Sequence, residues 1–175
     1  MQFFLKAQED FQLIINSDKK NILWLFFFIS LCLIFGNGLG GYFTFISVET
    51  WYQTLNKPSF NPPDWVFGPV WTTLYILMGI AAGIVWTKGF YHLWVKTALY
   101  HFVFQLLLNA SWSIVFFGLK ELFWALVVIV CLLILLIFTI RWFKVVSKTA
   151  AWLLIPYFIW VCYATVLTYK IWEMN

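Results

Sequence analysis

The sequence predicts an all-α membrane protein, a bundle of five transmembrane helices. Hydrophobic residues make up 63% of its 175 residues and charged residues only 10%, and the mean hydropathy is +0.88. Soluble domains contain about 45–50% apolar and about 25% charged residues. Five apolar segments can be distinguished, each near the roughly 20 residues that a spanning helix needs. At this length they are expected to form one compact domain.

The five spans are predicted at residues 22–47, 67–86, 93–117, 122–140 and 150–172, within one domain that covers residues 21–175. The first is longer than a bilayer requires, so we expect it to tilt or to begin at the interface. The fourth contains ALVVIVCLLILLIF and is apolar on all sides, which is typical of a scaffold helix. Pro156 lacks a backbone donor and is expected to bend the fifth.

Residues 1–20 precede the first span and contain acidic residues without a continuous apolar run. This composition does not predict a cleavable signal peptide. Phe4, Phe11 and Ile15 are spaced so that they can share a helix face. Two interpretations therefore stay open for this segment: an N-terminal tail or a short interfacial helix.

The basic residues predict the orientation in the membrane. Eight fall on one side of the predicted bundle: Lys6, Lys19, Lys20, Lys88, Lys96, Arg141, Lys144 and Lys148. Three fall on the other side: Lys57, Lys120 and Lys170. By the positive-inside rule, the N-terminus lies inside a bacterial cell membrane. The basic residues form no stripe of the kind that binds nucleic acid, so the expected partner is the lipid bilayer.

No metal site or catalytic constellation is expected. Cys32, Cys131 and Cys162 lie singly in three different spans, which predicts neither a disulfide framework nor a zinc site. His92 and His101 are nine positions apart and would lie on opposite faces of a helix. The acidic residues are isolated at the ends of segments, without a paired histidine or serine.

The segment from Trp51 to Tyr75 contains four of the five prolines and seven aromatic residues. Each proline fixes φ near −65° and removes a backbone donor, so we expect a stiff loop after the first span. One interpretation is a lid over a pocket, with these lid residues: Trp51, Pro58, Pro62, Pro63 and Trp65. The other is a belt of aromatic residues at the membrane interface.

Polar and aromatic residues form stripes along three spans. In the third span, Gln105, Asn109, Trp112 and Phe116 follow the spacing i, i+4, i+7 and i+11, which places them on one helix face. Amides are costly in hydrocarbon unless they pack between helices or face a wet cavity, and both interpretations stay open. Similar stripes contain Trp71 and Tyr75 in the second span, and Trp160 and Ala164 in the fifth. Together they favour a pocket for a flat apolar ligand.

Two GxxxG pairs predict close helix packing. Gly36 and Gly40 lie in the first span, and Gly79 and Gly83 in the second. Such pairs let backbones approach one another. We expect packing within the bundle, and a dimer seam is the second interpretation.

Four long motifs, in order, resemble the TspO/MBR family of tryptophan-rich sensory proteins and translocator proteins, also called peripheral benzodiazepine receptors. The motifs are GNGLGGYFT at 36–44, WYQTLNKPSFNPPDWVFGPVWTTLYILMG at 51–79, QLLLNASWSIVFFG at 105–118 and PYFIWVCYAT at 156–165. They cover almost the whole chain after residue 35. The resemblance implies a five-helix bundle, commonly a homodimer, that binds porphyrins, sterols and synthetic benzodiazepine-site ligands.

The same resemblance implies a pocket closed by the loop between the first two helices. Carried over by motif, the residues that line it or lie nearby are Tyr52, Trp71, Tyr75, Asn109, Trp112, Ser113, Phe116, Trp160 and Ala164. A porphyrin such as protoporphyrin IX or a haem-like tetrapyrrole is the expected ligand, with no cofactor required. Vertebrate members carry a cholesterol motif in the fifth helix that requires a spacer between its tyrosine and a basic residue. Here Tyr169 and Lys170 are adjacent, which disfavours tight sterol binding.

Three functions are compatible with these features. The first is a binding protein for tetrapyrroles that acts in their transport, sensing or control. The second is light- and oxygen-dependent porphyrin breakdown that uses the pocket tryptophans. The third is a structural membrane protein that binds sterol or lipid. We favour the first, because the sequence supplies indoles but no acid–base pair or metal ligand set, and fold alone does not decide function.

Overall fold

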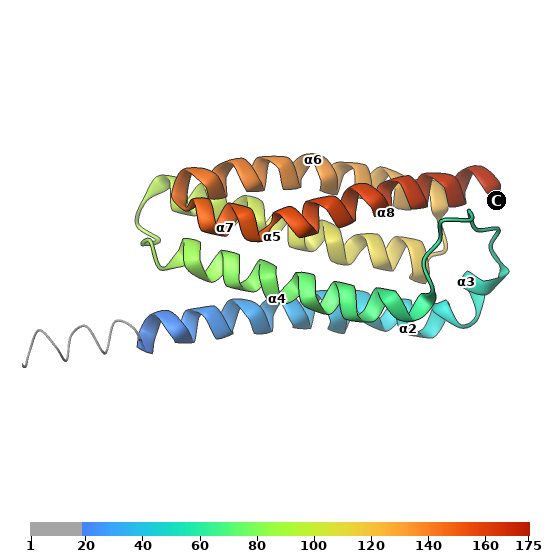
Figure 1. Cartoon of the computed structure of the whole chain (residues 1–175), viewed down its shortest axis with the longest axis horizontal. Helices are drawn as coiled ribbons and strands as arrows, with labels where there is room; N and C mark the ends of the chain where they lie inside the picture. Colours follow the sequence, from blue (N-terminus) through green and yellow to red (C-terminus); the bar gives the residue numbers. More distant parts are fainter. Residues whose placement is uncertain (1–18) are drawn as a thin grey trace, which may run out of the picture.

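The computed structural model describes residues 19–175 and shows a bundle of five membrane-length helical segments with no strand among these residues (Figure 1). The segments are Lys19–Val48, Asp64–Trp86, Leu93–Gly118, Leu122–Val146 and Lys148–Met174. The predicted fold class is therefore confirmed. The predicted tail or interfacial helix falls almost wholly outside the described residues.

The first span is helical from Lys19 and includes a π-helical stretch, η1 (Ile34–Gly40), before it continues as α2 (Gly41–Val48). A π turn takes in one extra residue and changes which side chains face the bundle. A short helix, α3 (Trp51–Thr54), comes next, and the loop after it ends in a 3₁₀ turn, η2 (Asp64–Val66).

The second and third spans are α4 (Phe67–Trp86) and α5 (Leu93–Ser113), and α5 ends in a π turn, η3 (Ile114–Gly118). The fourth is α6 (Leu122–Val146), and the fifth consists of α7 (Lys148–Leu153) and α8 (Ile155–Met174). The α6 helix extends six residues beyond the predicted end at 140. Arg141 and Lys144 lie in this extension and are exposed, so their long side chains can reach water while the helix continues.

The fifth span is interrupted close to Pro156, where the sequence predicts a bend. The proline lies in the first turn of α8, after a break at Leu154 that separates α7 from α8. A proline in the first turn costs no intrahelical hydrogen bond, because the N–H of that position has no helical acceptor. The break lies between Trp152, whose carbonyl would accept from residue 156 in a continuous helix, and Pro156, so it falls where a proline disrupts a helix.

Both GxxxG pairs pack within the chain, which confirms the first interpretation. A Cβ at Gly36 would collide with the ring of Tyr75, and one at Gly79 with the backbone of Ile29. A Cβ at Gly83 would lie 2.7 Å from Leu25 Cδ2, and one at Gly40 would lie 3.3 Å from Ser113 Cβ. These glycines hold the first span against α4 and α5, as small residues do in membrane bundles.

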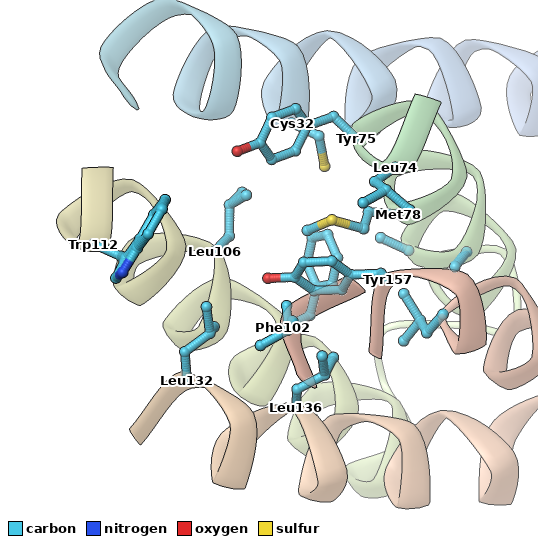
Figure 2. Packing of buried hydrophobic residues seen from close by; sticks show 14 of the residues in the cluster. Cys32, Leu74, Tyr75, Met78, Phe102, Leu106, Trp112, Leu132, Leu136 and Tyr157 are labelled. Atoms are coloured by element: carbon cyan, nitrogen blue, oxygen red, sulfur yellow. The ribbon is translucent and has the colours of Figure 1, made fainter. Parts of the chain in front are cut away.

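The interior is filled by side chains from all five segments. Figure 2 shows Cys32, Tyr75, Met78, Phe102 and Tyr157 converging between the first span, α4, α5 and α8. In Figure 1 the first span and α6 lie on opposite sides of the bundle, and α3 and the loop after it lie at the end that also holds the C-terminus.

Candidate ligand-binding cavity

A cavity of about 410 Å³ lies in the half of the bundle near α3. Its walls come from the first span, α4, the end of α5 with η3, and α8, and α3 and η2 contribute at its closed end. This volume lies within the roughly 300–1,000 Å³ typical of small-molecule sites. Four spans are needed to enclose it, so the site depends on assembly of the bundle.

The helices bring eight of the nine predicted site residues to the cavity wall. They are Tyr52, Trp71, Tyr75, Trp112, Ser113, Phe116, Trp160 and Ala164. Periodicity explains the agreement for the residues of the spans, because residues three or four positions apart share a helix face and these stripes converge in the bundle. Tyr52 lies on α3 and was expected from the family resemblance alone.

Aromatic rings dominate two walls. On the α4 wall Trp71 stacks on Tyr75, with ring centroids 5.5 Å apart and planes 23° apart. The ring of Trp160 on α8 meets Trp71 edge to face at 6.4 Å. On the α5 wall Trp112 stacks on Phe116 at 5.3 Å and 26°. Flat aromatic faces of this kind favour a flat apolar ligand.

Asn109 is the predicted residue that does not line the cavity. It lies behind the wall, where its Oδ1 accepts a 2.6 Å hydrogen bond from the Tyr75 hydroxyl. Its Nδ2 donates to the Tyr157 hydroxyl at 3.1 Å, and that hydroxyl donates to Gln105 Oε1 at 3.0 Å. The two amides therefore join α4, α5 and α8, as the packing interpretation of their stripe predicted. Figure 2 shows Tyr75 and Tyr157, the two tyrosines of this network.

The loop after α3 is tied down at several points. The Tyr52 hydroxyl donates to Asn61 Oδ1 at 2.6 Å, and the Tyr163 hydroxyl donates to the Phe60 carbonyl at 2.9 Å. Asn56 N donates to Asn175 Oδ1 at 2.9 Å, and Asn175 Nδ2 donates to the Asn56 carbonyl at 3.0 Å. The loop thus extends from the end of the first span to the end of α8. This is the path expected of a loop that covers the cavity.

The five predicted lid residues lie in or beside this loop but do not line the cavity. Trp51 packs edge to face on Phe116, with centroids 5.7 Å apart, and Trp65 is 75% exposed. Pro58, Pro62 and Pro63 lie in the loop between α3 and η2. Tyr52 and Asp64 are the residues of this region that reach the wall. The exposed position of Trp65 suits the interface-belt interpretation for that residue.

Tyr52 remains a hydrogen-bond donor over the physiological pH range. Burial raises the pKa of its phenol well above the ordinary value, and the negative charge of Asp64 acts in the same direction, whereas the bond to Asn61 lowers it. The Lys57 ammonium lies 4.3 Å from the centroid of the same ring. The phenol therefore stays neutral and keeps its bond to the loop.

The first span supplies a wall that the sequence pattern did not predict. Its contributions include Asn37, Gly41, Thr44 and Phe45. The available signal was the pair of polar residues Asn37 and Thr44, which are seven positions apart in an otherwise apolar run and so share a face. Asn37 Nδ2 donates a 2.9 Å hydrogen bond to Thr72 Oγ1 on α4.

Two indole donors of the wall are buried without a hydrogen-bond partner among residues 19–175: Trp112 Nε1 and Trp160 Nε1. Buried donors are nearly always paired, so each such group calls for an explanation. Both nitrogens are inaccessible from the cavity, so a molecule bound there would not contact them unless the side chains moved. Within the same described range, no group of three or more His, Cys, Asp or Glu residues lies close enough together to hold a metal ion.

Comparison with known proteins identifies the family. The model of the TspO/MBR family matches residues 20–173. The chain belongs to the TspO/MBR family. It is 44% identical over 157 residues to the tryptophan-rich protein TspO of Chlorobaculum tepidum, an alignment that covers 90% of this chain and 99% of that protein.

The chain is also similar to proteins from other groups of organisms. The chain is 41% identical over 127 residues to the human translocator protein, covering 71% of this chain and 75% of that one. It is 35% identical over 129 residues to protein CrtK of Rhodobacter capsulatus, covering 74% and 81%. This TspO/MBR member is therefore an integral, multi-pass membrane protein with a ligand-binding or sensing role.

Proposed function

We propose that the cavity binds a porphyrin or related tetrapyrrole and that the protein acts in the transport, sensing or control of that ligand. The observation that carries the proposal is the aromatic wall: Trp71 and Tyr75 stacked on α4, with Trp160 edge-on to Trp71 at 6.4 Å. Such a wall offers flat faces and edges to a planar ring system.

The polar groups of the cavity also suit this ligand class. Asn37, Thr44, Thr72 and Ser113 line the cavity, and their amide and hydroxyl groups can donate hydrogen bonds to the carboxylates of a natural porphyrin. These groups favour an apolar ligand that carries carboxylate or carbonyl oxygens.

Sterol is the less favoured ligand. Leu167 is buried and lines the cavity, whereas Tyr169 is 42% exposed and so faces a different environment. Lys170 pairs with Glu173 at 2.5 Å. Leu167 therefore does not share a surface with Tyr169 and Lys170, and we propose the tetrapyrrole in place of the sterol.

Titration of the purified protein in nanodiscs with protoporphyrin IX tests the proposal, with the Soret band of the porphyrin as readout. Trp71→Ala and Trp160→Ala each remove a large stacking surface, worth about 1–3 kcal/mol. Affinity should therefore fall about 5- to 150-fold. Trp152→Ala is the matched control, because Trp152 lies in α7 and is 73% exposed. Unchanged affinity in both folded cavity variants would exclude this site.

A second candidate function is light-dependent porphyrin breakdown. The observation that favours it is the closeness of Trp71, Tyr75 and Trp160, whose electron-rich rings adjoin the cavity. In this function the illuminated porphyrin would act as photosensitiser and dioxygen as oxidant. We rank it second because the sequence shows no acid–base pair and no metal or flavin site, so each turnover would depend on light.

The proposal includes a setting in the membrane. We propose that the N-terminus lies inside a bacterial cell membrane, as the eight-to-three distribution of basic residues indicates. We also propose a homodimer, on the resemblance to the family alone. Light scattering of the purified protein measures the oligomeric state, and a monomer at micromolar concentration would contradict this part.

A further inference from the structure

We propose that the ligand enters the cavity sideways from the bilayer, through the seam between the outer halves of the first span and α4. The alternative is entry from water past the loop after α3. The inference rests on the proposed function, because it concerns an apolar ligand that dissolves in the membrane. It concerns only the route and not the identity of the ligand.

The inner half of this seam is closed by direct backbone contact. A Cβ at Gly79 would collide with the backbone of Ile29, and one at Gly83 would lie 2.7 Å from Leu25 Cδ2. At the level of the cavity floor, Gly36 lies directly against the ring of Tyr75. No planar ligand can pass below this point without separating the two helices.

The outer half of the seam is loosely packed. A Cβ at Gly68 on α4 would meet nothing within 4 Å. A Cβ at Gly41 on the first span would meet only its own helix, at 3.7 Å from Gly36 O and 3.8 Å from Asn37 Cβ. Both glycines line the cavity. The two helices therefore have few contacts with one another where they border the cavity.

The rim of this part of the seam faces the surroundings of the bundle. Phe45 lines the cavity and is nevertheless 77% exposed. The first span is the segment with the smallest buried share of the five, and it lies beside α4 at the edge of the bundle in Figure 1. In a membrane, the surroundings of an apolar span at this position are lipid chains.

The seam is closed more weakly than the loop. Across residues 19–175, the bond from Asn37 Nδ2 to Thr72 Oγ1 is the only side-chain hydrogen bond between the first span and α4, and both groups are accessible. The loop is held by Asn56 and Asn175 through reciprocal bonds, and by Phe60 and Asn61 through bonds from two tyrosines. A single bond between neutral groups opens more readily than several at once.

Two reversible cross-links distinguish the routes. In a background in which the three native cysteines are replaced, Asn37→Cys with Thr72→Cys bridges the seam, and Asn56→Cys with Asn175→Cys bridges the loop to α8. A short bis-methanethiosulfonate reagent closes each pair, and a reductant reopens it. Protoporphyrin IX is added to vesicles that contain the protein, and the rates of association and dissociation are followed by stopped flow.

Closing the seam should slow association and dissociation at least 10-fold each, because ligand entry and ligand exit then share one blocked path. Closing the loop should change the rates less than twofold. The same protein after reduction is the internal control, since it carries the same substitutions. Equal rates in the open and closed seam, or slowing by the loop cross-link instead, would overturn the inference.

A second pair of variants tests the route without cross-linking. Gly41→Leu places a side chain in the seam and should slow association. Gly38→Leu is the matched control, because a Cβ there meets nothing within 4 Å and Gly38 does not line the cavity. Equal association rates in the two variants would count against the seam. If the unsubstituted protein does not bind porphyrin, the proposed function and this route are both overturned. If it binds normally but neither the seam cross-link nor Gly41→Leu changes the association rate, only the route is overturned.

Discussion

Replacement of Gly36 by alanine should disturb the floor of the cavity from the opposite helix. The added Cβ would collide with the ring of Tyr75. That ring has little freedom to move, because its hydroxyl is bonded to Asn109 at 2.6 Å and its face is stacked on Trp71. Overpacking of a filled interior costs about 1–3 kcal/mol. If Tyr75 swings away, its hydrogen bond is lost at a further 0.5–1.5 kcal/mol or so.

Gly38→Ala provides the matched control for this experiment. Both glycines lie in η1, and both gain up to about 1 kcal/mol of helix propensity on substitution by alanine. A Cβ at Gly38 meets nothing within 4 Å, so only the propensity term applies there. The difference between the two variants should therefore be roughly 1.5–4.5 kcal/mol.

The assay is the midpoint of thermal unfolding in detergent, monitored by loss of the monodisperse peak, together with the Soret titration of protoporphyrin IX. Gly36→Ala should unfold several degrees below Gly38→Ala and should bind protoporphyrin more weakly. Equal midpoints and equal affinities in the two variants would refute the argument that Gly36 is required by the ring of Tyr75.

Three further predictions address topology, packing and chemistry. Single cysteines placed at Lys57 and Lys144, in a background without native cysteines, should react with an impermeant maleimide from opposite sides of oriented vesicles. Labelling from the same side would contradict the orientation expected from the positive-inside rule. Asn109→Leu leaves the hydroxyls of Tyr75 and Tyr157 without their shared amide and should destabilise the bundle by about 1–3 kcal/mol in the same thermal assay. An unchanged midpoint would show that the network does not contribute to the stability of the bundle. Bound protoporphyrin should survive in darkness and disappear only when light and oxygen are both present. The measurement is the amount of product per protein molecule, compared with free porphyrin in the same detergent. Sustained turnover in the dark would make this protein an enzyme.

Much of the bundle was predictable, because length and periodicity determine it. A run of about 20 apolar residues has to span a membrane as a helix, which gives the number of spans. Within a helix, the spacing of Trp71 and Tyr75, or of Trp112 and Phe116, places each pair on one face. These stripes face inward in the structure and line one cavity, together with Trp160.

The role of the first span as a cavity wall could not be predicted in the same way. This span is apolar on nearly all sides, so its sequence shows no periodic contrast between a wall and a lipid face. The π turn at Ile34–Gly40 adds a residue to one turn and rotates the helix beyond it, which a 3.6-residue period does not anticipate. Only Asn37 and Thr44 indicated the face, through their polarity.

Contacts between distant parts of the chain were also beyond the sequence. Asn56 meets Asn175 across 119 positions, and Tyr163 meets Phe60 across 103. No local pattern encodes such pairs, since they depend on how the spans are arranged. The prolines predicted a stiff loop but did not indicate which residues would fasten it. The break at Leu154, by contrast, lies within the four residues ahead of Pro156, where a proline disrupts a helix.

The amide network behind the cavity implies an unequal tolerance for ligands of different shape. Tyr75 is fixed by Asn109, which is itself fixed by Tyr157, so the inner end of the cavity behaves as a rigid template. Toward the opposite end, the wall between the first span and α4 contains glycines with free space around them, and it can yield there. Variation among ligands should therefore be accommodated at their outer parts, such as peripheral substituents. The part of the ligand's ring system that reaches the cavity floor has to fit without any adjustment of Tyr75. The protein would therefore discriminate between related pigments at this end of the cavity.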